Sequence, residues 1–348
     1  MVFFAGPDST FPKKAIVVWL LSGCVLVFLM VVIGGITRLT GSGLSITEWN
    51  VIMGAIPPMN VHDWQLAFEK YQLSPQFQKV NFGMSLSEFK SIFLWEYVHR
   101  LTGRITGIVF LIPFLFFLFR KKISKPLFIQ LILLFGLGAL QGFLGWFMVR
   151  SGLVNNPHVS HYRLALHLFT AFITFGFTFW IALNILFPNK SDTHSGLRRL
   201  TAFLLLLLLL QIIYGALVAG LHAGLTYNTF PKMGDHWIAP GLSALTPVWK
   251  NLFENMVCVQ FIHRCIAWVL IALSLWVLLK IRNAGLSRIQ HKAVSFFCVA
   301  LGMQFVLGVC TLLFFVPVPL AVIHQAGAFA LFTSLLYLQH RLGSGAAG

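Results

Sequence analysis

The 348-residue sequence is poor in charged residues, and in acidic residues above all. Only 10% of its residues are charged, and Asp and Glu together number nine. A soluble domain has about a quarter of its residues charged, so this composition excludes an ordinary soluble fold. Cysteine is scarce as well, with five residues that all fall within apolar segments and form no CxxC motif. The cysteines therefore give no support to a disulfide framework or a thiol site, and we interpret them as small core residues.

Apolar residues are abundant instead. They make up 58% of the chain, and the mean hydropathy is +0.84. Apolar runs of about 20 residues recur along the whole length, and a helix of that length crosses a hydrocarbon core of roughly 30 Å. We therefore predict an all-α integral membrane protein with eight spans, at residues 15–37, 96–119, 126–149, 163–187, 198–221, 256–280, 291–315 and 319–338.

The net charge of +16 comes from basic residues in short segments between the apolar runs. In that position they report membrane orientation, so we expect no nucleic-acid partner. Most of these basic residues lie in inner segments if the N-terminus is cytoplasmic, which predicts that both termini are inside. The first apolar run is too long for a cleaved signal, and the residues before it do not resemble a transit peptide. The expected location is the inner membrane of a bacterium.

An internal repeat organises the chain. The stretch Glu96–Arg100 recurs as Gln260–Arg264, and Leu140–Gly145 recurs as Met303–Gly308. The offsets between the members of these two pairs agree within one position, so both belong to a single long repeat. A repeat of this length indicates two units of four spans each. Because four crossings is an even number, we predict parallel repeats and not the inverted repeats of many transporters.

The repeat also predicts the domain boundaries. We place the N-terminal four-helix unit at residues 1–190 and the C-terminal four-helix unit at residues 191–348. The outer loop at 38–95 mixes aromatic residues with prolines and charges, so we expect short amphipathic helices there. Its counterpart at 222–255 also follows the first span of its unit. We expect each loop to form a lid over the outer end of its bundle.

Four histidines occupy matching positions in the two halves, each near the start of a span that runs from outside to inside: His99, His167, His263 and His324. All four are therefore expected at one depth, near the outer face. Within each unit the two histidine-bearing helices are parallel, so their imidazoles can face each other across the bundle. Bis-histidine ligation of a haem iron requires such a pair. Interfacial histidines with satisfied hydrogen bonds are the alternative, but two equivalent pairs favour haem ligation.

Residues beside these histidines predict different roles for the two sites. Arg100 and Arg264 directly follow two of the histidines and are suited to pairing with haem propionates. Glu96 lies on the same helix face as the next histidine, whereas the matching residue in the second half is neutral Gln260. The difference predicts chemistry in the first half and a structural or electron-relay haem in the second. The alternative for Glu96 is an interfacial carboxylate paired with Arg100 or Arg104.

Several separate motifs resemble those of one family, at Gly34–Ser45, Trp95–Arg104, Gln141–Gly152, Tyr227–Gly234, Gln260–Arg264 and Pro319–Gln325. Together they resemble haem A synthase over about residues 30–340, in the branch shared by mitochondria and many Gram-negative bacteria. Another bacterial branch of that family has a cysteine pair in the first outer loop. This chain has none there, so a thiol-disulfide role is not carried over.

The resemblance implies an enzyme that oxidises the C8 methyl group of haem O to a formyl group by successive hydroxylation, giving haem A for terminal oxidases. It implies a haem b cofactor on His263 and His324, substrate haem O on His99 and His167, and a catalytic role for Glu96. The expected partners are haem O synthase, an electron donor such as a ferredoxin or a quinol, and the lipid bilayer. A homo-oligomer stays an open alternative.

Two other classes of protein stay open at this point. A membrane cytochrome b that only transfers electrons usually stacks two haems at different depths, with two histidines from each helix, whereas here each helix supplies one. A transporter of haem or of a small molecule needs polar residues along a path at mid-depth, and few are present. Extracted pigments separate the synthase from the electron carrier: haem O or haem A beside haem b supports the synthase, and haem b alone, at two per chain, supports the electron carrier.

Overall fold

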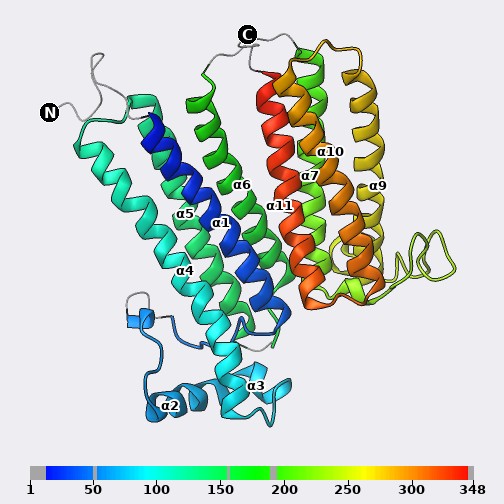
Figure 1. Cartoon of the computed structure of the whole chain (residues 1–348). Helices are drawn as coiled ribbons and strands as arrows, with labels where there is room; N and C mark the ends of the chain where they lie inside the picture. Colours follow the sequence, from blue (N-terminus) through cyan, green and yellow to red (C-terminus); the bar gives the residue numbers. More distant parts are fainter. Residues whose placement is uncertain (1–12, 50–52, 155–156, 189–193, 344–348) are drawn as a thin grey trace. The chain divides into compact units, whose positions relative to one another are not determined.

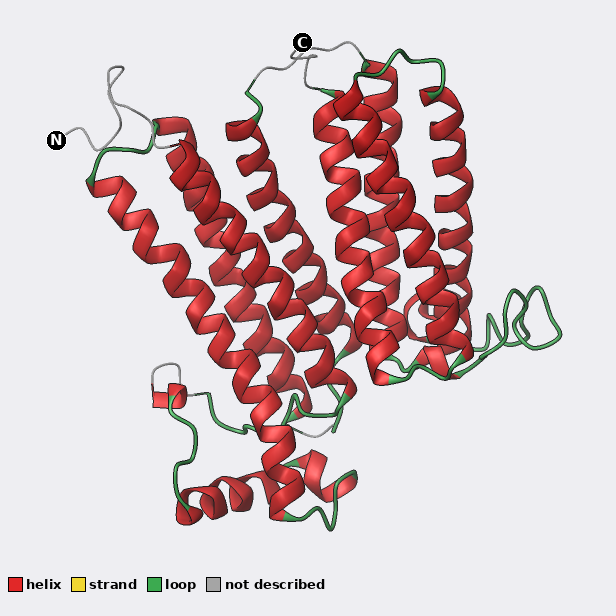
Figure 2. Ribbon diagram, in the orientation of Figure 1, coloured by secondary structure: helices red, strands yellow, loops and turns green. Residues whose placement is uncertain are grey.

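The computed structural model describes residues 13–49, 53–154, 157–188 and 194–343 (Figure 1). In these ranges every regular element is a helix, apart from one isolated β-bridge (Figure 2). The predicted all-α class is confirmed. Eight helices in the described ranges are long and apolar enough to cross a membrane: α1 (Lys13–Leu39), α4 (Leu86–Phe119), α5 (Lys125–Gly152), α6 (His161–Leu186), α7 (Ser195–Gly220), α9 (Met256–Ile281), α10 (Arg288–Leu313) and α11 (Val318–Leu342).

Polar capping residues begin several of these helices. Ser85 and Glu88 form a capping box at the start of α4, and Ser287 and Gln290 form another at the start of α10. The side chain of Asn255 accepts hydrogen bonds from the first backbone amides of α9. Each cap satisfies amide groups that have no partner inside the helix.

Helix α4 begins at Leu86, so the predicted start at residue 96 was too late. The cause is tertiary packing, which a hydropathy window does not detect. The extra turns carry Phe89 and Phe93, which are buried against the loop helices. Trp64 packs edge-on against Phe93 with ring centroids 5.1 Å apart, and Tyr71 stacks on Phe89 at 5.1 Å. Burial of these rings extends the helix beyond its apolar span.

The loop that precedes α4 contains η1 (Met53–Ala55), α2 (Val61–Gln72) and α3 (Pro75–Lys79). The predicted short helices in this loop are confirmed. The corresponding loop of the second half contains η2 (Ala223–Leu225), η3 (Val248–Lys250) and α8 (Asn251–Glu254). In each unit the long loop extends from one end of the helix bundle, and we call that end the loop end.

The chain divides into two compact units, Met1–Thr178 and Phe179–Gly348. In the first unit α1 packs along α4, and the indole nitrogen of Trp19 donates to the carbonyl of Val109 at 2.9 Å. In the second unit α7 packs on α9 and α10 packs on α11.

The last turns of α6 belong to the second unit, where Trp180 packs edge-on against His340 with ring centroids 5.0 Å apart. The predicted boundary between residues 190 and 191 falls outside the described residues. The contact between Trp180 and His340 lies within the second unit.

Candidate functional site

The two predicted histidines of the first unit lie against glycines of neighbouring helices. A Cβ atom on Gly34 of α1 would lie 3.0 Å from Cε1 of His99 on α4. A Cβ atom on Gly145 of α5 would lie 3.5 Å from Cε1 of His167 on α6. The missing side chains let both imidazole rings approach the neighbouring backbone closely.

The second unit repeats this arrangement on its own helices. A Cβ atom on Gly215 of α7 would lie 3.3 Å from Cε1 of His263 on α9. A Cβ atom on Gly308 of α10 would lie 2.9 Å from Cε1 of His324 on α11. Each of the four histidines thus lies against a glycine of another membrane-spanning helix, the one that comes immediately before its own among the eight spans. These glycines were not predicted as site residues, although Gly145 and Gly308 lie in the sequence repeat.

The rings of each predicted pair are also brought near each other. His99 and His167 are close enough for their charges to interact, and so are His263 and His324. The Nδ1 atoms of all four rings are buried, and none is within hydrogen-bonding geometry of a partner among the described residues. Pairs of histidines on apolar helices are the donor set that a bis-histidine haem requires, so haem ligation by these residues stays a prediction. The described residues contain no cluster of three or more His, Cys, Asp or Glu side chains that could hold a metal ion.

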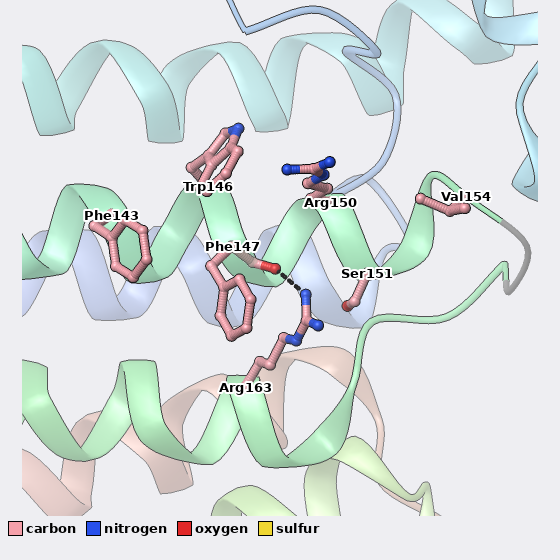
Figure 3. Close-up of a pocket in the computed structure, with 7 residues that line it drawn as sticks. All are labelled: Phe143, Trp146, Phe147, Arg150, Ser151, Val154 and Arg163. Carbon is pink, nitrogen blue, oxygen red and sulfur yellow. Dashed lines mark hydrogen bonds between the residues drawn. The ribbon is translucent and has the colours of Figure 1, made fainter.

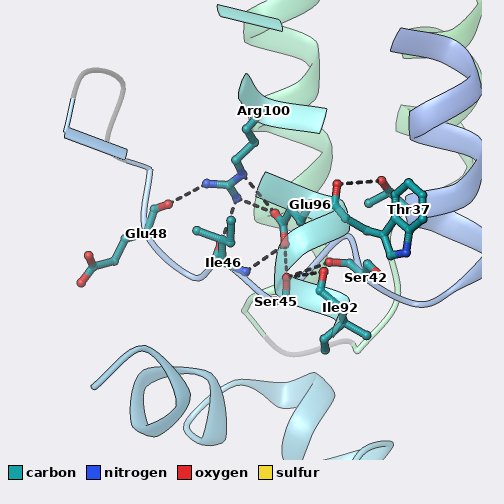
Figure 4. Close-up of polar contacts among 9 residues, drawn as sticks. Thr37, Ser42, Ser45, Ile46, Glu48, Ile92, Glu96 and Arg100 are labelled. Atoms are coloured by element: carbon teal, nitrogen blue, oxygen red, sulfur yellow. Dashed lines mark hydrogen bonds and ion pairs between the residues drawn. The ribbon is translucent and has the colours of Figure 1, made fainter. Parts of the chain in front are cut away.

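Glu96 is buried and fully engaged in hydrogen bonds (Figure 4). One carboxylate oxygen accepts hydrogen bonds from the Ser45 hydroxyl at 2.7 Å and from the backbone N–H of Ile46 at 2.8 Å. The other accepts from Nη2 and Nε of Arg100, at 2.7 and 3.1 Å. The ion pair between Glu96 and Arg100, which was the alternative interpretation of this residue, is therefore present. It anchors the chain that follows α1 onto α4.

Arg100 completes this anchor. Its guanidinium group donates to the backbone carbonyls of Glu48 at 2.8 Å and Ile46 at 2.9 Å. It also lies over the Trp49 ring, 4.8 Å from the centroid. Most of its donors are therefore used within the protein (Figure 4), and its pairing with a propionate stays a prediction.

The second unit contains the same anchor. Arg264 donates to the carbonyls of Tyr227 at 2.7 Å, Thr229 at 2.8 Å and Lys232 at 3.2 Å. Gln260, which matches Glu96, donates to the Tyr227 carbonyl at 3.0 Å. A carboxylate accepts from the loop in one unit, and an amide donates to the loop in the other.

The two anchors share one register. The offset in the sequence from Ile46 to Tyr227 equals the offset from Glu48 to Thr229. Arg100 donates to the carbonyls of Ile46 and Glu48. Arg264 donates to the carbonyls of the matching residues, Tyr227 and Thr229. The agreement extends the sequence repeat to individual hydrogen bonds and supports the interpretation of two equivalent units.

A network around Tyr71 attaches the loop helices to this region. The phenol of Tyr71 donates to Gln76 at 3.1 Å and accepts from Asn81 at 2.7 Å, and Gln76 donates to the Gly41 carbonyl at 2.8 Å. Burial raises the pKa of the Tyr71 phenol; the hydrogen bond from Asn81 opposes this rise, and the negative charge of Glu96 adds to it. The phenol therefore stays protonated at neutral pH.

One polar contact of the second site was not predicted. The side-chain amide nitrogen of Gln211 on α7 donates to the backbone carbonyl of His263 at 3.0 Å and lies 3.4 Å from its Nε2 atom. Gln211 stands four residues before Gly215, so both lie on the same face of α7. The matching position of the first unit, which stands four residues before Gly34, is the apolar residue Met30. The sequence signal that could have identified Gln211 was the presence of a polar residue inside an apolar span.

Comparison with known proteins agrees with this geometry. Residues 17–336 match the COX15-CtaA family, which is described as cytochrome oxidase assembly protein. A protein of Nitrosospira multiformis named heme A synthase is 51% identical over 334 residues, which cover 95% of this chain and 94% of the relative. A protein of Flavobacterium johnsoniae with the same name is 46% identical over 335 residues, covering 95% of this chain and 98% of the relative. The chain therefore belongs to the haem A synthase family of cytochrome oxidase assembly proteins.

Proposed function

We propose that this chain is a haem A synthase, a membrane oxidoreductase that converts the C8 methyl group of haem O to a formyl group. The observation that carries the proposal is the set of four histidines, each with a buried Nδ1 atom and each lying against a glycine, in a chain that belongs to this family. Two haem sites in one chain match an enzyme that uses one haem as cofactor and another as substrate.

The second unit suits the resident cofactor, haem b, on His263 and His324. Haem b supplies one-electron oxidation and reduction when it is bound. The chain's residues hold the rings: Gly215 and Gly308 set the approach of the imidazoles, and Gln211 contacts the backbone and ring of His263. Such positioning suits a permanent cofactor, because outer contacts fix the orientation of ligating imidazoles.

The first unit suits the substrate, with haem O on His99 and His167 and a catalytic contribution from Glu96. Arg100 and Ser45 hold the carboxylate of Glu96 in one position, one helical turn before His99. Glu96 therefore has two roles in this proposal: it anchors the loop and holds a negative charge near the substrate.

The same proposal includes the setting of the enzyme. We place it in the bacterial inner membrane with both termini in the cytoplasm and both loop ends outside, because basic residues favour the opposite ends of the bundles. The proposal also includes haem O synthase as the supplier of the substrate and a ferredoxin or a quinol as electron donor.

Pigment analysis tests the function. The chain is produced in a bacterium that makes haem O and has no haem A synthase of its own, and haems are extracted from membranes and from the purified protein. Haem A in the membranes, and haem O or haem A beside haem b in the protein, is the expected result. Haem b alone at two per chain, with no haem A, would instead identify an electron-transferring cytochrome b.

Two substitutions separate the roles of Glu96. Glu96→Ala should leave the haem b spectrum nearly intact and stop haem A accumulation. Glu96→Gln keeps one oxygen that accepts from Ser45 and Ile46 but removes the charge and the ion pair with Arg100, so it should weaken the loop anchor only in part, because Arg100 still donates to the loop carbonyls, and should still lose activity. If Glu96→Gln made as much haem A as the wild type, the negative charge of Glu96 would have no role in the mechanism.

A further inference from the structure

A pocket of about 540 Å³ lies between the end of α5 and the start of α6, and none of its residues has a role so far (Figure 3). It is lined by three aromatic rings, two arginines and two smaller residues: Phe143, Trp146, Phe147, Arg150, Ser151, Val154 and Arg163. The lining contains no acidic residue. It therefore combines an apolar wall with positive charge.

Aromatic rings hold both arginines in place. The guanidinium carbon of Arg163 lies 3.6 Å from the centroid of Phe147, and its Nη1 donates to the Phe147 carbonyl at 2.5 Å. The guanidinium carbon of Arg150 lies 5.3 Å from the centroid of Trp146. A guanidinium stacked on a ring keeps the N–H groups along its edge available as donors. Neither arginine forms an ion pair within the described part of the chain.

The pocket adjoins the proposed substrate site. Arg163 stands four residues before His167 on α6, so both lie on one face of that helix, one turn apart. Trp146 and Phe147 directly follow Gly145, the glycine that His167 contacts. A planar ligand on His167 therefore has this pocket beside it, toward the loop end.

The charge of the pocket indicates the chemistry of its ligand. Two cations near an apolar wall need anionic partners, and planar guanidinium groups match carboxylates by two parallel hydrogen bonds. Arg100 is less available for this task, because Glu96 and the loop carbonyls of Ile46 and Glu48 occupy most of its donors.

We propose that Arg150 and Arg163 bind the two carboxylate groups of the substrate haem, with its apolar edge against Trp146 and Phe147. This assignment rests on the proposed function of the first unit. The phosphate of an anionic phospholipid has related chemistry, so the test includes it.

Binding measurements on the purified full chain test the assignment. The protein, with its haem b, is placed in nanodiscs of phosphatidylcholine and titrated with haem O or with the diester of haem O, in which both carboxylates are blocked. The wild type should bind the free acid at least tenfold more tightly than the diester. In the double variant Arg150→Gln/Arg163→Gln, affinity for the free acid should fall by roughly tenfold for each arginine, and affinity for the diester should stay the same.

Two further variants act as controls. Arg120→Gln removes another arginine of the first unit that lies over a ring, Phe116, at the far end of α4, and it should bind both ligands as the wild type does. Arg150→Lys/Arg163→Lys keeps the charge without the planar fork and should restore part of the preference for the free acid. The haem b spectrum reports folding in every variant.

Defined results overturn the assignment. An unchanged preference for the free acid in the Gln double variant would refute it. Loss of co-purified phosphatidylglycerol from that variant, with the preference intact, would assign the pocket to a lipid phosphate instead. If the wild type converts haem O to haem A but binds acid and diester equally, only this inference fails. If the wild type neither binds nor converts haem O, the proposed function fails.

Discussion

Replacing the four glycines that contact histidines by alanine should weaken haem binding in an order set by the structure. The added methyl group would lie 2.9 Å from the His324 ring at Gly308 and 3.3 Å from the His263 ring at Gly215. Carbon atoms pack best at about 3.5–4.0 Å. Gly308→Ala therefore forces the ring to move by roughly half an ångström or more, whereas Gly215→Ala needs a smaller shift.

The magnitude follows from two opposing effects. Overpacking in a close-packed interior costs about 1–3 kcal/mol, and alanine stabilises a helix by about 1 kcal/mol relative to glycine. Without haem, Gly308→Ala should therefore change thermal stability little, because the imidazole is free to move aside. With haem, the ring is fixed by the iron, so the full cost appears as a loss of affinity of roughly 5- to 100-fold.

The assay compares haem content and stability in matched variants. Haem b is measured by reduced-minus-oxidised spectra after purification, and its release is followed by competition with a haem-binding apoprotein. Gly302→Ala is the control on the same helix, since a methyl group there would meet nothing within 4 Å. In the first unit, Gly34→Ala at 3.0 Å should weaken haem O binding more than Gly145→Ala at 3.5 Å.

The result that would refute this reasoning is specific. If Gly308→Ala retained haem b as firmly as Gly302→Ala, the contact with His324 would not position an iron ligand. The same conclusion would follow if Gly145→Ala, which only makes an ordinary contact, harmed its site more than Gly34→Ala.

Two further predictions concern single side chains. His263→Ala should lose the resident haem b while haem O binding to the first unit persists; a purified variant with an unchanged haem b spectrum would refute the assignment of the second unit. Tyr71→Phe should lower stability by about 1 kcal/mol at neutral pH, because hydrogen bonds with Gln76 and Asn81 are lost. Because the folded state raises the pKa of Tyr71, its stabilising effect is present below about pH 10 and lost above it. Thermal unfolding of Tyr71→Phe should therefore depend less on pH between 9 and about 11 than that of the wild type.

The sequence predicted those residues of the candidate site that recur at matching positions in the two halves of the chain. Matching positions identified the four histidines, and the structure brings the members of each pair near one another. The roles of the arginines were harder to predict. The pairing of Arg100 and Arg264 with propionates stays a prediction, and the sequence did not show that both would also donate to backbone carbonyls of a loop that is distant in the chain. Residue type identifies a cation, but only the fold shows which acceptor it meets.

Glu96 illustrates the same division. The sequence showed a carboxylate where the second half has an amide, and that difference still distinguishes the two units. The sequence did not show that Ser45 and Ile46 would occupy one of its oxygens. Partners so far away in the chain are brought there by the path of a loop, which no local pattern specifies.

The sequence by itself determined the class of the protein and its eight spans, because membrane burial selects long apolar helices. It also predicted the duplication and the histidine pairs, because repeats preserve spacing. Tertiary structure alone decided three features: the early start of α4 against the aromatic loop helices, the glycine contact at each histidine, and the aromatic pocket that presents Arg150 and Arg163. These features depend on contacts between helices. Such contacts are set by distances across the bundle, and the order of residues along one helix carries no direct record of them.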